Sequence, residues 1–343
     1  MRTVYVVLSC DTDPDRRGFL PGVPAGTLTW RGMTEGIPAL KSLLRDVKDS
    51  RGREPVFTWL LRADEQVRSV HGDYGWVARA HGAFLRTLEE GGDELGWHPH
   101  FWRRDRDNGP WFQEVADVDW QVNMLHTAHR DFVAALERVP RTVRMGWSYH
   151  NNRTYGLLET LRVVIDCSAL PGYRTLMGRR ARGENLFDWR PTPRMPFRPS
   201  REDYRRPARG SEGSFPVLEV PSFVSTSLPW SLVGGVKLAL KTWDPRQLWF
   251  AARRPTYCIN VTARPLYFSP LLAELRQVLR RPGLDPVVFS TQFHADELLP
   301  NRSHLYTPGA LKANLRALLR ACERAGTPVE FVQAGRIAEL WPH

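Results

Sequence analysis

Short apolar runs alternate with helix-like stretches along most of this chain, and no other feature limits its fold as strongly. The run at 4–10 is followed by a helix predicted over 36–49 and by a second strand-like run at 56–61. The same order then recurs as a helix over 76–90, a short strand that leads to His98, a helix over 119–138, a strand over 142–146, a helix over 152–161 and a strand over 163–167. Repeated βα units imply an α/β fold with a parallel sheet that is closed or nearly closed.

The periodic pattern stops between 172 and 214 and then resumes. This segment is rich in Arg, Pro and Gly, but it also carries Trp189, Phe197 and Tyr204, which favours an ordered loop over the barrel mouth rather than a flexible linker. The elements predicted beyond it are a strand over 217–220, a helical stretch near 229–250, a strand over 257–261, a helix over 269–280, a strand over 287–290, a helix over 308–325, a strand over 329–332 and a short final helix. We expect one domain over 1–343, with an irregular active-site loop at about 172–214.

Two pairs of polar residues stand where strands should end. Asp11 and Asp13 follow the first apolar run, and His98 and His100 follow a glycine-rich turn. Residues two apart on extended backbone project from one face, so each pair can converge on a single ion. Carboxylate oxygen and imidazole nitrogen suit zinc or a similar divalent metal, and three protein ligands leave coordination positions for water and substrate. The alternative is that the aspartates cap a turn and the histidines lie on the surface.

Composition limits the class of protein. A chain of 343 residues with 42% hydrophobic content can bury a large core. No stretch approaches the roughly 20 apolar residues that span a bilayer, and the first strand reaches Asp11 too early for a signal peptide, so we expect a cytoplasmic protein. The four cysteines form no C-x-x-C pair, which argues against a zinc knuckle or a redox motif.

The net charge of +11 comes largely from dispersed arginines. No zinc finger, helix-turn-helix or aromatic RNA-binding signature accompanies them, so we expect no nucleic-acid partner. A basic rim could instead attract an anionic substrate, such as a nucleotide sugar or a pyrophosphate lipid, or a membrane surface rich in acidic lipids. The sequence does not indicate an oligomeric state.

A family resemblance follows from the order of these motifs. Asp11-Thr12-Asp13, the stretch from Glu94 to His100, Arg144 and Phe293-His294 occur in the order of the polysaccharide deacetylase motifs. The chain resembles this family, also known as NodB-homology proteins or carbohydrate esterase family 4, over nearly its whole length, as an atypical subgroup with an H-P-H metal motif. The resemblance implies a distorted (β/α) barrel of about seven parallel strands. It also implies one divalent metal ion, with zinc expected and cobalt, nickel or ferrous iron as alternatives.

The same resemblance implies roles for individual residues. Asp11 matches the general base, and Arg144 matches the arginine that orients it. Asp13 and His98 match metal ligands. The family's second metal histidine would stand at Trp102, so His100 must replace it, unless its side chain points away. His294 matches the late histidine that serves as general acid, and Asp296 could orient its ring.

Candidates for substrate binding lie in a polar loop and in the irregular segment. Trp147 and Trp189 could stack on a sugar ring, and Tyr149 and His150 could contact sugar hydroxyls. The alternative for the tryptophans is packing, and for His150 an exposed loop position.

The expected reaction is removal of an N-acetyl group from an N-acetylated amino sugar or glycan. The substrate could be a nucleotide sugar, a lipid-linked precursor or a glycoside. Two alternatives share the fold: a metal-dependent amidohydrolase of a non-sugar C–N bond, and a non-catalytic glycan-binding relative. A D-x-D glycosyltransferase fits less well, since it would leave the three histidines without a role.

Overall fold

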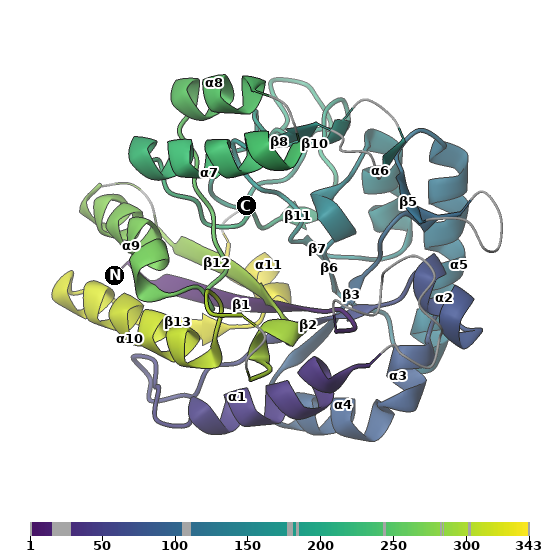
Figure 1. The fold of residues 1–343 in the computed structure, drawn as a ribbon, viewed down its shortest axis with the longest axis horizontal. Coiled ribbons are helices and arrows are strands. Elements are labelled where there is room, and N and C mark those ends of the chain that lie inside the picture. Colours follow the sequence, from purple (N-terminus) through teal and green to yellow (C-terminus); the bar gives the residue numbers. More distant parts are fainter. Residues whose placement is uncertain are drawn as a thin grey trace.

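The computed structural model describes residues 2–15, 29–104, 111–176, 181–182, 185–242, 245–281, 283, 285–300 and 303–341. A curled sheet of parallel strands lies at its centre, with helices on the outside (Figure 1). The strands of this sheet are β1 (Val4–Thr12), β2 (Thr58–Arg62), β3 (Glu94–His98), β6 (Thr142–Val143), β7 (Ile165–Asp166), β11 (Leu218–Glu219), β12 (Val287–His294) and β13 (Val329–Val332). Their order is β11-β7-β6-β3-β2-β1-β12, and β13 also pairs with β1.

The sheet curls far enough for its two end strands to approach each other. The chain leaving β11 reaches β12, where the Phe223 amide donates a 2.7 Å hydrogen bond to the Ser290 carbonyl. The distorted (β/α) barrel expected from the sequence is therefore confirmed.

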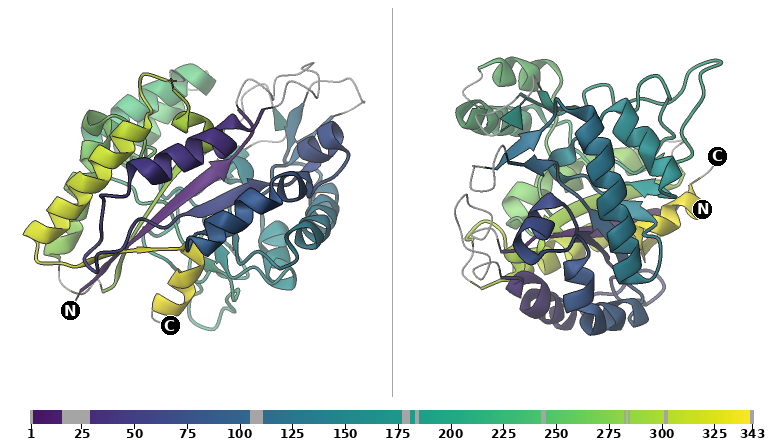
Figure 2. Two further views of the ribbon diagram at one scale, coloured as in Figure 1. Left: turned by 90° about the horizontal axis from the view of Figure 1, so that it is seen from below. Right: turned by 90° about the vertical axis from the view of Figure 1, so that its right-hand side faces the viewer.

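Helices cover the outer face of the sheet (Figure 2). They are α1 (Ile37–Leu43), α2 (Glu65–His71), α3 (Trp76–Ala80), α4 (Gly82–Glu90), α5 (Val118–Leu136), α6 (Asn152–Thr160), α7 (Leu228–Thr242), α8 (Arg246–Arg253), α9 (Pro265–Arg280), α10 (Pro308–Arg324) and α11 (Ile337–Leu340). Several begin at a residue that caps free backbone amides, as Asn151 does for α6 and Thr307 for α10. In the described part of the chain, no helix is long and apolar enough to cross a membrane.

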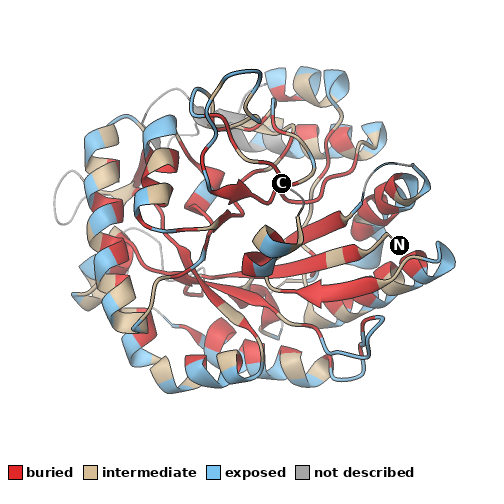
Figure 3. Ribbon diagram, turned by 180° about the vertical axis from the view of Figure 1, so that it is seen from behind, coloured by how far each residue is buried: buried red, intermediate tan, exposed pale blue. Residues whose placement is uncertain are grey.

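Strand β1 explains how the core leads to a polar site. The strand is almost entirely buried, as its run of apolar residues requires when both faces are covered (Figure 3). Val7 packs with apolar residues of β7, β11, β12 and β13. Side chains alternate along a strand, so Ser9 and Asp11 project from the same face as Val7. That face therefore changes from apolar to polar toward the carboxyl end of β1.

Strand register brings the remaining groups to this end. In the ladder between β1 and β12, Asp11 is paired with His294, and in the ladder between β2 and β3, Arg62 is paired with His98. Carboxyl ends of parallel strands meet at one edge, which is where barrels of this kind place their active sites.

The segment 172–214 contains short strands in its described parts. They are β8 (Arg174–Leu176), β9 (Ala181–Arg182) and β10 (Asn185–Asp188); β8 pairs with β10, and β9 pairs with β5 (Phe112–Glu114), which itself pairs with β4 (Trp102–Arg103). The aromatic side chains Trp189, Phe197 and Tyr204 are buried, as an ordered segment requires.

The local structure differs from the sequence prediction at several places. The strand expected over 257–261 forms only a single bridge between Tyr257 and Ser225, because the segment turns to place Asn260 beside the site. The helix expected over 76–90 is divided into α3 and α4 at His81, where Gly82 follows and the helical geometry is interrupted. Helix α2 was not expected from the sequence, although Asp64 is a standard helix-capping residue.

Candidate active site

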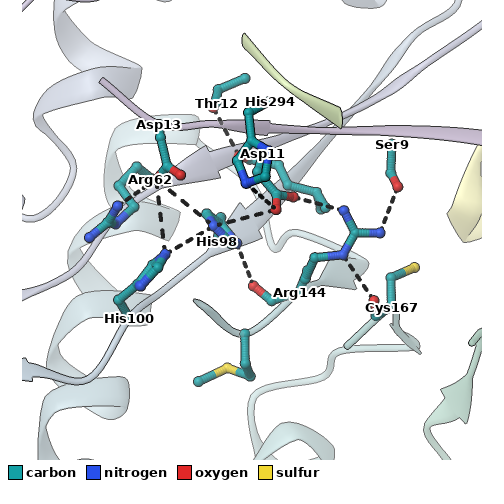
Figure 4. A network of polar contacts seen from close by, with 12 residues as sticks. Ser9, Asp11, Thr12, Asp13, Arg62, His98, His100, Arg144, Cys167 and His294 are labelled. Carbon is teal, nitrogen blue, oxygen red and sulfur yellow. Dashed lines mark hydrogen bonds and ion pairs between the residues drawn. The ribbon is translucent and has the colours of Figure 1, made fainter. Parts of the chain in front are cut away.

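Arg144 holds Asp11 in one orientation. Its Nη1 donates to Asp11 Oδ1 at 2.7 Å, its Nη2 donates to Ser9 Oγ at 2.6 Å and its Nε donates to the Cys167 carbonyl at 2.9 Å (Figure 4). Only 2% of Arg144 and 5% of Asp11 are exposed, so this ion pair is buried. A guanidinium that is held by a hydroxyl and a backbone carbonyl has little freedom to leave the carboxylate.

The charges around Asp11 keep it ionised. Burial by itself raises the pKa of the Asp11 carboxyl, but its interactions with His98, Arg144 and His294 outweigh burial and lower this pKa to about 2. Asp11 is therefore an anion at neutral pH, as a base that accepts a proton must be.

His294 faces the other oxygen of Asp11. Its Nε2 lies 3.8 Å from Asp11 Oδ2, and its Nδ1 lies 3.4 Å from Glu297 Oε1 and 3.4 Å from Asn260 Nδ2. Glu297 is itself fixed, because its Oε1 accepts a 2.7 Å hydrogen bond from Asn260 and its Oε2 accepts one from Thr262. Glu297 thus places a fixed carboxylate beside the Nδ1 side of the His294 imidazole.

Asp13, His98 and His100 converge as the sequence predicts. His98 Nε2 and His100 Nε2 each lie 3.9 Å from Asp13 Oδ1, and the two nitrogens are 3.1 Å apart. One ligand atom from each of the three residues lies within 4.8 Å of the others. His100 therefore does not point away from the site.

Hydrogen bonds of the two imidazoles define where their protons lie. His98 Nδ1 is 2.8 Å from the Arg144 carbonyl, which can only accept, so the neutral His98 ring has its proton on Nδ1 and its lone pair on Nε2, on the side of Asp13. His100 Nδ1 accepts a 3.0 Å hydrogen bond from Trp102 Nε1, which can only donate. The proton of neutral His100 is then on Nε2, where it points toward His98 Nε2.

These three side chains fit a divalent metal ion, but the proton on His100 Nε2 must move before His100 can bind it. Asp13 and His98 already direct ligand atoms toward one point, and nitrogen with carboxylate oxygen is a ligand set that zinc accepts. Ligation through His100 Nε2 requires its proton to move to Nδ1 or to leave, and a proton on Nδ1 would oppose the Trp102 donor.

Comparisons with known proteins agree with this architecture. No protein-family model and no curated protein matches the sequence. Among solved structures, a candidate glycoside hydrolase/deacetylase from Parabacteroides distasonis aligns over 99% of this chain and 71% of its own, with a TM-score of 0.54 and 12% identity. A candidate polysaccharide deacetylase from Mycobacterium smegmatis aligns over 98% of this chain and 90% of its own, with a TM-score of 0.53 and 15% identity. Another such candidate, from Pseudomonas aeruginosa PAO1, has the same coverage, a TM-score of 0.52 and 13% identity.

The chain has the polysaccharide deacetylase fold. In this fold the two aspartates, the three histidines and Arg144 of the sequence prediction lie together at one edge of the sheet (Figure 4). The comparison shows the architecture and not the roles of these residues.

A second buried ion pair supports the histidine loop of this deacetylase fold. Arg62 contacts Asp13 Oδ1 and Asp64 Oδ2, and it donates to Gln66 Oε1 at 2.7 Å. Asp64 Oδ2 also accepts the backbone amide of His100 at 3.0 Å. Neither Arg62 nor Asp64 was predicted from the sequence, although Arg62 is a charged residue at the end of the apolar run of β2 and could have indicated a site there.

The four residues expected to bind substrate differ in exposure. Trp147 is 38% exposed, its ring lies 5.8 Å from that of Trp102, and its φ of 57° lies in the left-handed region. Tyr149 is buried, and its hydroxyl donates to the Val115 carbonyl at 3.0 Å. Stacking on a sugar is therefore open to Trp147, whereas Tyr149 is buried with its hydroxyl already bound to the backbone.

His150 and Trp189 lie beneath the surface. The His150 side chain is fully buried, with Nε2 3.1 Å from Asp166 Oδ2. Trp189 is also fully buried, and its Nε1 donates to the Ser148 carbonyl at 2.7 Å. In this arrangement both residues support the Trp147 loop from below, and direct contact with a substrate would require them to become exposed.

Proposed function

We propose that this chain is a metal-dependent hydrolase that removes an N-acetyl group from an amino sugar. The observation that carries the proposal is the ionised Asp11, held by Arg144 and facing His294, beside the Asp13, His98 and His100 cluster. The fold supports it, since structures with this architecture include candidate polysaccharide deacetylases.

Asp11 would accept the proton of the attacking water. Arg144 occupies Asp11 Oδ1, so Oδ2, which faces the histidines, is the oxygen that acts as the base. Because Arg144 is bound at three points, the carboxylate keeps its position while its charge changes.

His294 would donate a proton to the departing amine. It lies across Asp11 from His98, and it is 25% exposed, which leaves it open to a substrate. Glu297 holds its Nδ1 side and stabilises the protonated ring until the C–N bond breaks.

A divalent ion held by Asp13, His98 and His100 would supply Lewis-acid polarisation of the acetamide carbonyl, and zinc is the first expectation for this ligand set. Trp147 would stack on the sugar ring, which places the acetamide over Asp11 and His294. Trp189 would support the Trp147 loop through its hydrogen bond to the Ser148 carbonyl. The cytoplasmic location expected from the sequence stays a prediction.

The proposal is tested by metal analysis together with acetate release from a panel of N-acetylhexosamine donors. We expect about one divalent ion per chain, and a loss of activity of roughly 100-fold or more for Asp11→Asn and for His294→Gln. Asp119→Asn is the matched control, since this aspartate is 77% exposed on α5 and should behave as wild type.

Other outcomes of this experiment would contradict the assigned base or support an alternative function. Acetate release that persists in Asp11→Asn would refute the assigned base. A chain that binds metal but hydrolyses only cyclic imides or ureides would be an amidohydrolase of non-sugar C–N bonds, and metal binding with no turnover of any donor would indicate a glycan-binding relative.

A further inference from the structure

Helix α7 exposes an apolar face. The exposed fractions are 46% for Leu228, 36% for Leu232, 56% for Val233, 46% for Val236 and 71% for Leu240. At 100° per residue these five positions fall on one side of the helix. An exposed apolar stripe of this length is unusual on a water-soluble surface and marks a binding site.

The opposite face of α7 makes the contacts with the rest of the protein. Ser231 Oγ donates to the Ala251 carbonyl of α8 at 2.9 Å, and Gly235 lies so close to Ala251 that a Cβ would meet its side chain at 2.7 Å. The small residues Ser231 and Gly235 are therefore buried while the five large apolar residues of the stripe are exposed, which reverses the usual pattern of a surface helix.

Helix α8 extends the surface and surrounds it with positive charge. Trp249 is 55% exposed, and the Arg253 guanidinium lies 5.1 Å from its ring centre. Lys237, Arg253 and Arg254 are exposed, and among the described residues none of the three has a carboxylate partner. The two helices lie together at the outer edge of the molecule (Figures 1 and 2).

A basic pocket opens beside these helices. Its volume is about 450 Å³, and its charged lining residues are Asp188, Arg190, Arg205, Arg253 and Arg254. Asp188 is already paired with Arg190, whose Nε lies 2.7 Å from it. The lining thus carries a net positive charge next to an apolar surface, and this combination matches a lipid phosphate with its acyl chains.

We propose that α7 and α8 form a docking surface for an anionic membrane, with the apolar stripe in the acyl boundary and the pocket around a lipid phosphate. A bilayer suits this surface better than a second copy of the chain. A two-fold contact would bring Lys237, Arg253 and Arg254 of one copy against the same residues of the other, whereas anionic lipid pairs with all of them.

The docking surface connects to the active site through the segment 188–190. Arg190 lines the pocket, and its neighbour Trp189 donates to the carbonyl of Ser148, which follows Trp147. If the proposed function holds, this connection indicates the class of substrate. We expect an amino sugar attached to a lipid phosphate, with the phosphate in the pocket and the sugar at Trp147.

Vesicle sedimentation tests the docking surface without any turnover. Wild type should bind vesicles of phosphatidylcholine that contain phosphatidylglycerol, and binding should weaken at high salt and on phosphatidylcholine alone. Val233→Glu/Leu240→Glu should abolish binding. The matched control is Asn123→Glu/Ala134→Glu, which makes the same change of charge at exposed positions of α5 and should bind as wild type.

A second double substitution tests the basic pocket. Arg253→Gln/Arg254→Gln should weaken binding to anionic vesicles about 30-fold, at about fivefold for each arginine near the surface, and should leave the weak binding to neutral vesicles unchanged. Circular dichroism and the thermal midpoint of each variant show that it is folded.

Two results would overturn the proposal. One is equal binding of wild type and Val233→Glu/Leu240→Glu to anionic vesicles. The other is a wild type that fails to bind vesicles but sediments as a dimer that the same double substitution converts to a monomer, which would make the stripe an interface between copies. A protein that binds vesicles yet releases acetate from no donor would retain the docking surface and refute only the proposed function.

Discussion

Replacing Trp102 by phenylalanine should strengthen metal binding, although it alters no ligand. Trp102 Nε1 donates to His100 Nδ1 at 3.0 Å, so the proton of neutral His100 lies on Nε2, the atom that faces Asp13 and His98. An ion that uses His100 Nε2 must displace this proton and give up the hydrogen bond from Trp102. Phenylalanine keeps most of the ring and removes the donor.

The magnitude follows from that one hydrogen bond. A neutral hydrogen bond of this kind contributes about 0.5 to 1.5 kcal/mol, so metal affinity should rise about 2- to 10-fold in Trp102→Phe. Isothermal titration calorimetry with zinc, in competition with a chelator, resolves a change of this size. Trp341→Phe is the control, since it makes the same change on a side chain that packs against the apolar cluster around Val7.

A double-variant cycle shows whether the gain comes through His100. The gain on Trp102→Phe should disappear when His100→Ala is also present, because no imidazole proton then has to move. Equal or weaker zinc binding by Trp102→Phe would refute the reasoning, and it would mean that His100 does not bind the ion through Nε2.

Further predictions concern other parts of the site. Gly146→Ala places a Cβ about 2.0 Å from the His100 ring, so calorimetry should show zinc affinity about 10- to 100-fold lower, while Gly309→Ala, whose Cβ meets nothing, should bind zinc as wild type. Arg144→Gln leaves the Asp11 carboxylate buried without its partner, and urea denaturation should show a loss of about 3 kcal/mol in the free energy of unfolding, reduced when Asp11→Asn is added. Burial and the nearby Asp166 raise the pKa of Glu219 well above 4.5, so its contribution to stability is complete below pH 4.5 and is lost as pH rises toward the folded pKa. Relative to Glu219→Gln, the wild type should lose about 1.4 kcal/mol per pH unit in that window, and parallel stability curves for the two proteins would exclude a protonated Glu219.

Much of the site could be predicted because it depends on strand ends. Asp11 and His98 end apolar runs, and in a parallel sheet such ends must meet. Arg144 was predicted through family resemblance, and the structure places it on Asp11. Arg62 and Glu297 were not predicted, because their roles depend on which residues lie opposite them after the sheet and the loops have packed.

The strand predicted over 257–261 shows a second limit of prediction from the sequence. Its run of mostly apolar residues fits a strand, and Val261 is indeed buried. The structure instead uses this segment as a connection, in which Asn260 donates to Glu297 Oε1 at 2.7 Å. Burial was correctly indicated by the pattern, but pairing with a neighbouring strand is a tertiary property that a single segment does not carry.

The electrostatics of the site explain why His100 is the residue that an incoming ion must alter. Burial raises the pKa of Asp13, but its charged neighbours, with Arg62 first among them, more than offset burial and lower this pKa below the usual range, so the carboxylate is ionised before any cation arrives. Arg62 also binds Asp64, which accepts a hydrogen bond from the backbone amide of His100. The carboxylate ligand and the histidine loop are therefore positioned together.

Two of the three metal ligands are prepared before an ion binds, because Asp13 is ionised and the Arg144 carbonyl directs the lone pair of neutral His98. The remaining cost of binding lies in the proton on His100, which is why a substitution at Trp102 should change metal affinity more directly than one at either arginine.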